Sequence, residues 1–192
     1  MAETERDALF QVLDALEALQ ISYMIVGSFA STFWGRPRMT HDADLVVEIT
    51  AEQTADLAEL LASHFYAPQF VIEDAVRKRD QFNVIHLEYA FKVDMWLRKD
   101  SPYDVVCFKR RLLRVVFGRE VWLSSPEDVI LSKLRWYRAA PALGRQFRDA
   151  VEVYEIQEPY LEQDYLDQWA LQLGIADLLE WVRREAARPP EE

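Results

Sequence analysis

The stretch YMIVGSFASTFWGRPRMTHDADLVVEI, residues 23–49, carries the pattern from which the fold can be predicted. Its first four residues are apolar and partly β-branched, which is typical of a buried strand, and the run stops at Gly27. Ser28 offers an N-cap for a short helix over residues 29–34. Residues 42–49 (DADLVVEI) alternate in polarity and then become apolar, which predicts a second strand. The stretch therefore predicts a strand, a short helix and another strand in close succession.

The rest of the chain extends this mixed pattern to about residue 123 and is helical afterwards. Apolar residues recur at helical spacing in residues 4–20 and 52–65. The predicted strand pairs are 82–87 with 91–97, and 114–117 with 120–123, and the predicted later helices are 124–140, 145–157, 162–173 and 175–187. We therefore expect an α+β fold in which residues 1–123 form a mixed sheet flanked by helices. A C-terminal helical bundle, residues 124–192, is expected to pack on that core.

Composition excludes several classes of protein. The 192 residues include a single cysteine and carry a net charge of −11. An acidic chain is not coated in basic surface, so we expect no specificity for double-stranded DNA. Cys107 alone allows neither an internal disulfide nor a Cys-rich zinc site. The acidic first residues do not resemble a signal peptide and no apolar run reaches roughly 18 residues, so we expect a cytoplasmic protein with no membrane span.

The charge is unevenly distributed along the chain. Residues 98–148 carry +7, whereas residues 1–97 and residues 149–192 each carry −9. A basic middle third in an acidic protein favours a local phosphate site. The same arginines and lysines would also fit solvent-exposed helix faces, and charge alone leaves both interpretations open.

Gly27 and Ser28 lie where a predicted strand meets a predicted helix. Glycine lets a ligand approach the backbone closely, and a helix start presents unpaired N–H groups and a partial positive charge. Such a turn suits a phosphate group. Ordinary strand-to-helix turns also use these residues, so the pair on its own is weak evidence.

Three aspartates are the strongest chemical signal. Asp42 and Asp44 are two residues apart at the start of a strand, so their carboxylates lie on one face and would repel each other unless a cation neutralises them. Asp94 lies within FKVDMWL, residues 91–97, where a buried carboxylate is costly unless it is paired or bound to a metal. Solvation at the strand end, an edge position or a salt bridge to arginine are the alternatives. Together with the Gly-Ser turn, the three acids form a coherent two-metal site.

Residues 27–45 (GSFASTFWGRPRMTHDADL) resemble the nucleotidyltransferase superfamily that includes DNA polymerase beta and the minimal nucleotidyltransferases. Members of that family combine an apolar strand, Gly-Gly or Gly-Ser, a short helix, Asp-x-Asp, and a third Asp on a neighbouring strand. The segment 125–134 (SPEDVILSKL), with Arg138 and the pair Arg148–Asp149, further resembles the AbiEii/AbiGii-type branch of bacterial toxin–antitoxin systems. The resemblance covers roughly residues 20–155, most of the chain.

The resemblance implies a role for each matching residue. Asp42 and Asp44 would hold two Mg²⁺ ions, and Asp94 would complete one metal site and accept the proton of the attacking hydroxyl. Gly27 and Ser28 would cradle the phosphates of an NTP such as ATP. The resemblance further assigns phosphate binding to Lys133 and nucleotide binding to Arg38 and Thr40, which could instead brace the loop ahead of Asp42. It assigns supporting roles to Arg138 and Asp149.

The function implied is Mg²⁺-dependent transfer of NMP from an NTP to an acceptor hydroxyl, with residues 1–123 as the catalytic core. The acceptor is open: a tRNA 3′ end suits the basic middle third, whereas a protein hydroxyl or a small molecule suits the net acidity. A toxin held by an antitoxin protein fits the AbiEii-type resemblance. The alternative from another class is a non-catalytic module that keeps the fold and binds a nucleotide or a partner.

Overall fold

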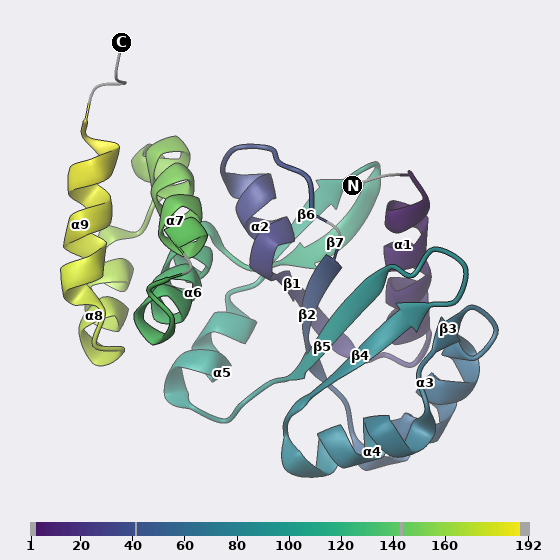
Figure 1. The fold of residues 1–192 in the computed structure, drawn as a ribbon. Helices are drawn as coiled ribbons and strands as arrows, with labels where there is room; N and C mark the ends of the chain where they lie inside the picture. The colour runs from purple at the N-terminus through teal and green to yellow at the C-terminus, as the bar shows by residue number, and fades with distance from the viewer. Residues whose placement is uncertain (1–2, 41, 143, 189–192) are drawn as a thin grey trace. The chain divides into compact units, whose positions relative to one another are not determined.

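A computed structural model describes residues 3–40, 42–142 and 144–188, and its elements follow the predicted order (Figure 1). The first part of the chain contains α1 (Glu3–Ala18), β1 (Ser22–Val26), α2 (Gly27–Trp34), β2 (Asp42–Glu48), η1 (Ala51–Gln53), α3 (Thr54–Leu61), β3 (Phe65–Tyr66), α4 (Gln69–Lys78), β4 (Gln81–His86) and β5 (Lys92–Leu97). The second part contains α5 (Pro102–Lys109), β6 (Leu112–Val116), β7 (Arg119–Leu123), α6 (Pro126–Ala139), α7 (Gly144–Gln157), η2 (Glu158–Tyr160), α8 (Gln163–Gln172) and α9 (Ala176–Ala186).

Within the described residues, seven strands form one mixed sheet in the order β3-β4-β5-β2-β1-β7-β6. β1 pairs antiparallel with β2 and parallel with β7, while β2 pairs parallel with β5. The predicted hairpins are confirmed: β4 pairs with β5 and β6 pairs with β7, both antiparallel. The predicted α+β fold with a mixed sheet and flanking helices is therefore confirmed.

The central strand β2 has two chemically different faces. Ala43, Leu45 and Val47 are fully buried on one face, while Asp42 and Asp44 alternate with them on the other. Helix α1 contacts β1 and α3, and α3 contacts α4, which contacts β4. Burial of apolar side chains of these helices, among them Leu13 of α1, supplies the main favourable free energy of folding in this part of the chain. The other face of β2 therefore carries the two carboxylates and is the face on which a polar site could form.

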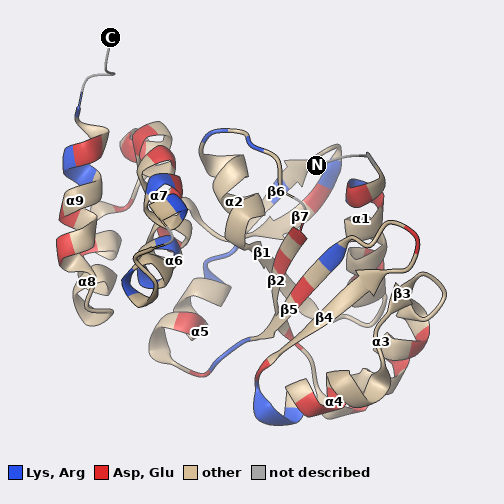
Figure 2. Cartoon of the chain, in the orientation of Figure 1, with Lys and Arg blue, Asp and Glu red and all other residues tan. Residues whose placement is uncertain are grey.

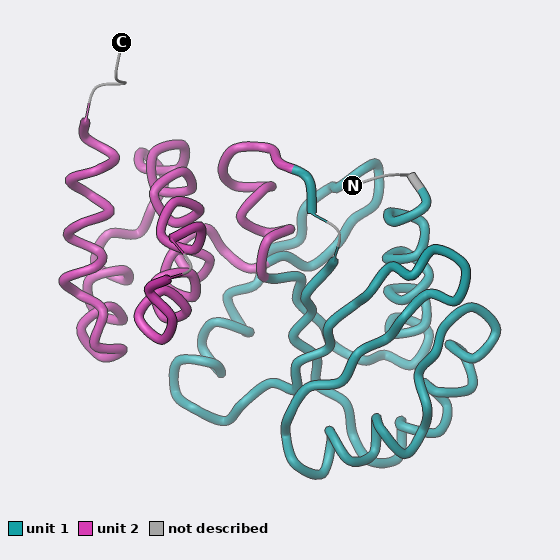
Figure 3. The backbone as a smooth tube through the Cα atoms, viewed as in Figure 1, with its two compact units in different colours: residues 1–26, 39–123 teal, residues 27–38, 124–192 magenta. Residues whose placement is uncertain are grey.

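The chain divides into two compact units, coloured separately in Figure 3: residues 1–26 with 39–123, and residues 27–38 with 124–192. The second unit is helical, and in it α2 contacts α6 and α7. The indole Nε1 of Trp34 donates to the carbonyl of Ser124 at 2.7 Å, and Gln157 Nε2 donates to the carbonyl of Trp34 at 2.8 Å. Helix α2 therefore packs against α6 and α7, far along the chain. The assignment of a catalytic core to residues 1–123 stays a prediction.

Several elements differ from the prediction. The predicted helix over 52–65 is a short 3-10 turn followed by α3, and Phe65 lies in β3. Helices α4 and α5 were not predicted. β-Branched residues are frequent in α5 (PYDVVCFK) and weaken its helical signal, but Ser101 Oγ caps the helix by accepting from the Asp104 N–H at 3.2 Å.

The predicted N-cap at Ser28 is wrong, because α2 begins one residue earlier, at Gly27. Gly27 has φ = +63°, a left-handed conformation that glycine adopts without a steric penalty. Ser28 consequently lies in the first turn of the helix. The predicted start of the later helix is confirmed, since Ser125 caps α6 and Pro126 follows it.

In the part of the chain that the structure describes, every helix is too short or too polar to cross a membrane.

Candidate functional site

The three predicted aspartates lie on one face of two neighbouring strands. Asp42 and Asp44 are on β2, and the parallel pairing with β5 sets Asp44 opposite Asp94 and Asp42 opposite Lys92. Neighbouring strands are about 4.8 Å apart, and residues paired across them share a face of the sheet. We call Asp42, Asp44 and Asp94 the carboxylate group. Figure 2 shows acidic residues on β2 and β5 next to a basic residue on β5.

Thr40 and Trp96 orient two of these carboxylates. The hydroxyl of Thr40 lies 3.0 Å from Asp42 Oδ1 and 3.1 Å from the Asp42 carbonyl oxygen, and Thr40 itself is buried. Trp96 Nε1 donates a long hydrogen bond of 3.5 Å to Asp44 Oδ1. Thr40 therefore contacts Asp42, and its contact with a nucleotide stays a prediction.

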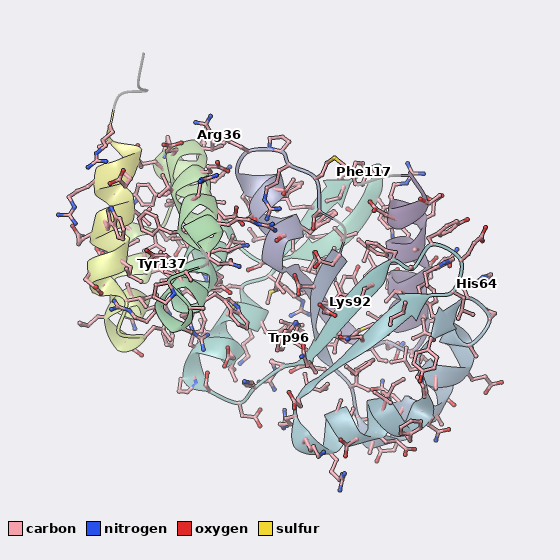
Figure 4. The ribbon with its side chains drawn as sticks, in the orientation of Figure 1. Arg36, His64, Lys92, Trp96, Phe117 and Tyr137 are labelled. Atoms are coloured by element: carbon pink, nitrogen blue, oxygen red, sulfur yellow. The ribbon has the colours of Figure 1, made fainter. Side chains whose placement is uncertain are left out.

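Asp94 has one paired and one unpaired oxygen. Lys92 Nζ donates to Asp94 Oδ2 at 2.7 Å, whereas Asp94 Oδ1 is buried and has no hydrogen-bond partner among the described residues. A buried acceptor left unsatisfied costs about 1–3 kcal/mol, so this oxygen is open to a donor from water or a ligand. The hydrogen bond to Asp94 raises the pKa of Lys92 despite partial burial, and the negative charges of Asp42 and Asp44 act in the same direction. Figure 4 labels Lys92 and Trp96 on β5.

The carboxylate group fits a hard divalent cation in residue type, and its members share one face of the sheet. Three carboxylates on adjacent strands supply the oxygen ligands that Mg²⁺ prefers. Among the residues that the structure describes, however, no three His, Cys, Asp or Glu side chains are already arranged as a metal site. Binding of a cation would therefore require side-chain rotation within the group.

The second unit contains a separate basic cluster, which we define as Ser28, Arg38, Lys133, Arg145 and Asp149. At its centre, Asp149 Oδ2 accepts from Lys133 Nζ at 2.7 Å and from Arg38 Nη2 at 3.1 Å. Ser31 Oγ donates to the same oxygen at 3.2 Å. Burial would raise the pKa of Asp149, but the charges and hydrogen bonds of Lys133 and Arg38 outweigh burial and lower it. Asp149 is therefore an ionised, buried anchor for two cations.

Ser28, in the first turn of α2, accepts hydrogen bonds from the two guanidinium groups of this cluster. Its Oγ accepts from Arg38 Nη2 at 2.8 Å and from Arg145 Nη2 at 3.3 Å. Arg38, Lys133 and Arg145 supply three cationic side chains to the cluster. A helix start with N–H groups, a left-handed Gly27 and cationic side chains has the chemistry of an anion site.

Arg138, which the resemblance assigned a supporting role, pairs with Asp177 of α9 on the surface. Sequence reasoning missed Lys92, Ser31 and Arg145. Lys92 could have been found, because it precedes Asp94 by two residues and so shares its face of the strand. Arg145 carried no local signal, since its contact with Ser28 spans more than a hundred residues.

Comparison with known proteins supports the fold. No protein-family model matches the chain, and no curated protein matches it by sequence. Among solved structures, the antibiotic-resistance factor ANT(2'')-Ia in solution is 15% identical with a TM-score of 0.60, covering 96% of this chain and all of that one. A crystal structure of ANT(2'')-Ia in complex with adenylyl-2''-tobramycin has a TM-score of 0.56 at 15% identity, covering 96% and 99%.

A third structure is an antigenic nucleotidyltransferase-like protein from Paracoccidioides brasiliensis, 19% identical with a TM-score of 0.57, covering 95% of this chain and 94% of that one. At these identities the likeness establishes a nucleotidyltransferase-like fold over nearly the whole chain.

Proposed function

We propose that the protein is a Mg²⁺-dependent nucleotidyltransferase that moves NMP from an NTP to a hydroxyl group of a small molecule. The observation that carries this proposal is the pairing of Asp44 with Asp94 on adjacent strands, with Asp42 on the same face. The nucleotidyltransferase-like fold agrees with it.

In this proposal Asp42, Asp44 and Asp94 would hold two Mg²⁺ ions. Bound Mg²⁺ would neutralise negative charge that grows on the attacking and leaving oxygens. Thr40 keeps the Asp42 carboxylate in place through its hydroxyl. The acceptor oxygen attacks the α-phosphorus, the bond to pyrophosphate breaks, and Asp94 Oδ1 takes the hydroxyl proton, because that oxygen is an acceptor with no donor among the described residues.

The basic cluster is proposed to bind the β- and γ-phosphates. Gly27 and Ser28 contribute the start of α2, and Arg38 and Lys133 contribute positive charge. Asp149 supports them by holding both cations through Oδ2. Arg138 supports the helical unit, since its ion pair joins α6 to α9.

A small-molecule acceptor is proposed for two reasons. ANT(2'')-Ia, which shares the fold, was crystallised with an adenylylated antibiotic, adenylyl-2''-tobramycin. The net charge of −11 also disfavours a polyanionic acceptor. The second candidate, favoured by the +7 charge of residues 98–148, is an AbiEii-type toxin that modifies tRNA and is held by an antitoxin.

The test is incubation with each α-³²P-labelled NTP, Mg²⁺, and separate pools of aminoglycosides, total tRNA and protein. The control is the double variant Asp42→Asn/Asp44→Asn, whose folding is checked by circular dichroism. We expect label on a small molecule with the intact protein only. Label on tRNA would select the second candidate, and NTP binding in calorimetry without any transfer would favour the non-catalytic module.

A further inference from the structure

Lys92 is the basic residue most closely surrounded by the carboxylate group. It lies on β5 two residues before Asp94, on the same face, and opposite Asp42 in the β2–β5 register. Its ammonium donates to Asp94 Oδ2 at 2.7 Å. Lys92 thus meets the same carboxylate that is proposed to hold the metal.

The pair differs from the ion pairs on the helix surfaces. The Asp94 side chain is 13% exposed, whereas the Lys92 side chain is 40% exposed. In the surface pair of Lys78 and Asp74, by contrast, the side chains are 58% and 42% exposed. A pair with one buried partner is less screened by water and so holds more strongly than a surface pair. The Lys92 ammonium can still move away from Asp94, because its side chain is partly exposed and four rotatable bonds connect the ammonium to the backbone.

We propose that Lys92 competes with the divalent cation for Asp94, so that this side chain sets the metal affinity of the site. An ammonium and a Mg²⁺ ion cannot share one carboxylate oxygen without strong repulsion. In the proposed function Asp94 Oδ1 takes the hydroxyl proton, which leaves Oδ2 for the metal, and Lys92 occupies Oδ2. Metal binding through Oδ2 therefore requires Lys92 to release that oxygen. This inference rests on the proposed function, which places the metal on Asp42, Asp44 and Asp94.

The competition makes metal binding depend on the nucleotide. A triphosphate provides new anionic partners for the displaced ammonium, so release of Asp94 is easier when an NTP arrives with the metal. Lys92 acts in this account as a positioning residue: it acts through Asp94 and does not take part in the bond changes. Its removal should raise metal affinity in the absence of nucleotide, and a merely structural role would not do so.

The experiment measures binding of Mn²⁺, a paramagnetic substitute for Mg²⁺, by loss of its free electron-paramagnetic-resonance signal. The full chain is compared with Lys92→Met, Lys92→Gln and Lys92→Arg. The matched control is Lys78→Met, which removes a lysine that pairs with an exposed aspartate. A second control, Asp94→Asn, removes the carboxylate that the ammonium and the metal are proposed to share.

We expect Lys92→Met and Lys92→Gln to bind Mn²⁺ on the order of tenfold more tightly than the unchanged protein, the scale of one lost charge-assisted hydrogen bond. Lys92→Arg and Lys78→Met should bind as the unchanged protein does, and Asp94→Asn should bind more weakly. Addition of a non-hydrolysable NTP analogue should reduce the difference between Lys92→Met and the unchanged protein.

Unchanged or weaker Mn²⁺ binding by both neutral variants, with Asp94→Asn still weakened, would overturn the competition and leave the metal site intact. Equal binding by the unchanged protein, Asp94→Asn and Asp42→Asn/Asp44→Asn would instead overturn the metal site, and with it both the proposed function and this inference. Thermal unfolding of each variant shows that it is folded before binding is compared.

Discussion

Asp149 shows how a single oxygen can organise a charged cluster at the residue scale. Lys133, Arg38 and Ser31 all donate to Oδ2 of this buried carboxylate. Removing one partner of such a pair leaves uncompensated charge in a poorly hydrated place, which is far more destabilising than breaking a surface pair. The cluster therefore depends on Asp149 for stability as well as for position.

We predict that Asp149→Asn lowers the free energy of unfolding by about 3 kcal/mol at pH 7, because Lys133 and Arg38 lose a buried counter-charge. The pKa of Asp149 is lowered in the folded state, so its stabilisation is present above the unfolded pKa of about 3.9 and is lost as the pH falls through the folded value. Urea denaturation at several pH values measures this effect. The free energies of unfolding of Asp149→Asn and of the unchanged protein should converge as the pH falls below about 4.

The control for this prediction is Asp177→Asn, which removes the exposed partner of Arg138 and should leave stability unchanged. If Asp149→Asn lowered the free energy of unfolding by the same amount at pH 3 and at pH 7, the electrostatic explanation would be contradicted.

At the scale of elements, local sequence signals predicted several strands well. The alternation in residues 42–49 and the paired runs around Gly118 correspond to β2 and to the β6–β7 hairpin. Helix α5 was missed because its β-branched residues have weak helical propensity, which the Ser101 cap offsets. The register that sets Asp44 opposite Asp94 could not be predicted, since it depends on pairing between strands that are distant in the sequence.

The turn from β1 into α2 requires glycine. We predict that Gly27→Ala lowers the free energy of unfolding by about 1–2 kcal/mol, because a side chain at φ = +63° meets the backbone carbonyl. Urea denaturation measures the loss. The matched control is Gly144→Ala at the first residue of α7, where an added Cβ has no atom within 4 Å; it should be neutral or slightly stabilising. Equal effects of the two substitutions would argue against strain at Gly27.

At the scale of the whole molecule, the division into units could not be predicted from local patterns. Residues 27–38 belong with residues 124–192 through contacts that span more than a hundred positions in the chain, such as Gln157 with Trp34. The carboxylates were identifiable because polar residues interrupt apolar strands. Arg145 was not identifiable, because charged residues on a helix surface give no sign of their partners.

The net charge of −11 predicts a salt effect on the proposed reaction. A negatively charged protein attracts a cationic acceptor over distances set by the screening length, which falls from about 30 Å at 0.01 M salt to about 8 Å at 0.15 M. We therefore expect kcat/KM for a polycationic aminoglycoside to fall severalfold over this range. An uncharged sugar acceptor serves as the control and should show little change. A rate that rises with salt for the cationic acceptor would contradict the prediction.

The most direct test of nucleotidyl transfer compares NTP labelled at the α-phosphate with NTP labelled at the γ-phosphate, using the unchanged protein and Asp44→Asn. In nucleotidyl transfer the α-label moves to the acceptor and the γ-label leaves in pyrophosphate. We predict that result for the unchanged protein. In Asp44→Asn the rate of α-label transfer should fall by about a hundredfold or more, which is the effect of removing one main group that stabilises charge in the transition state. Transfer of the γ-label to the acceptor, or undiminished α-label transfer by Asp44→Asn, would contradict the account.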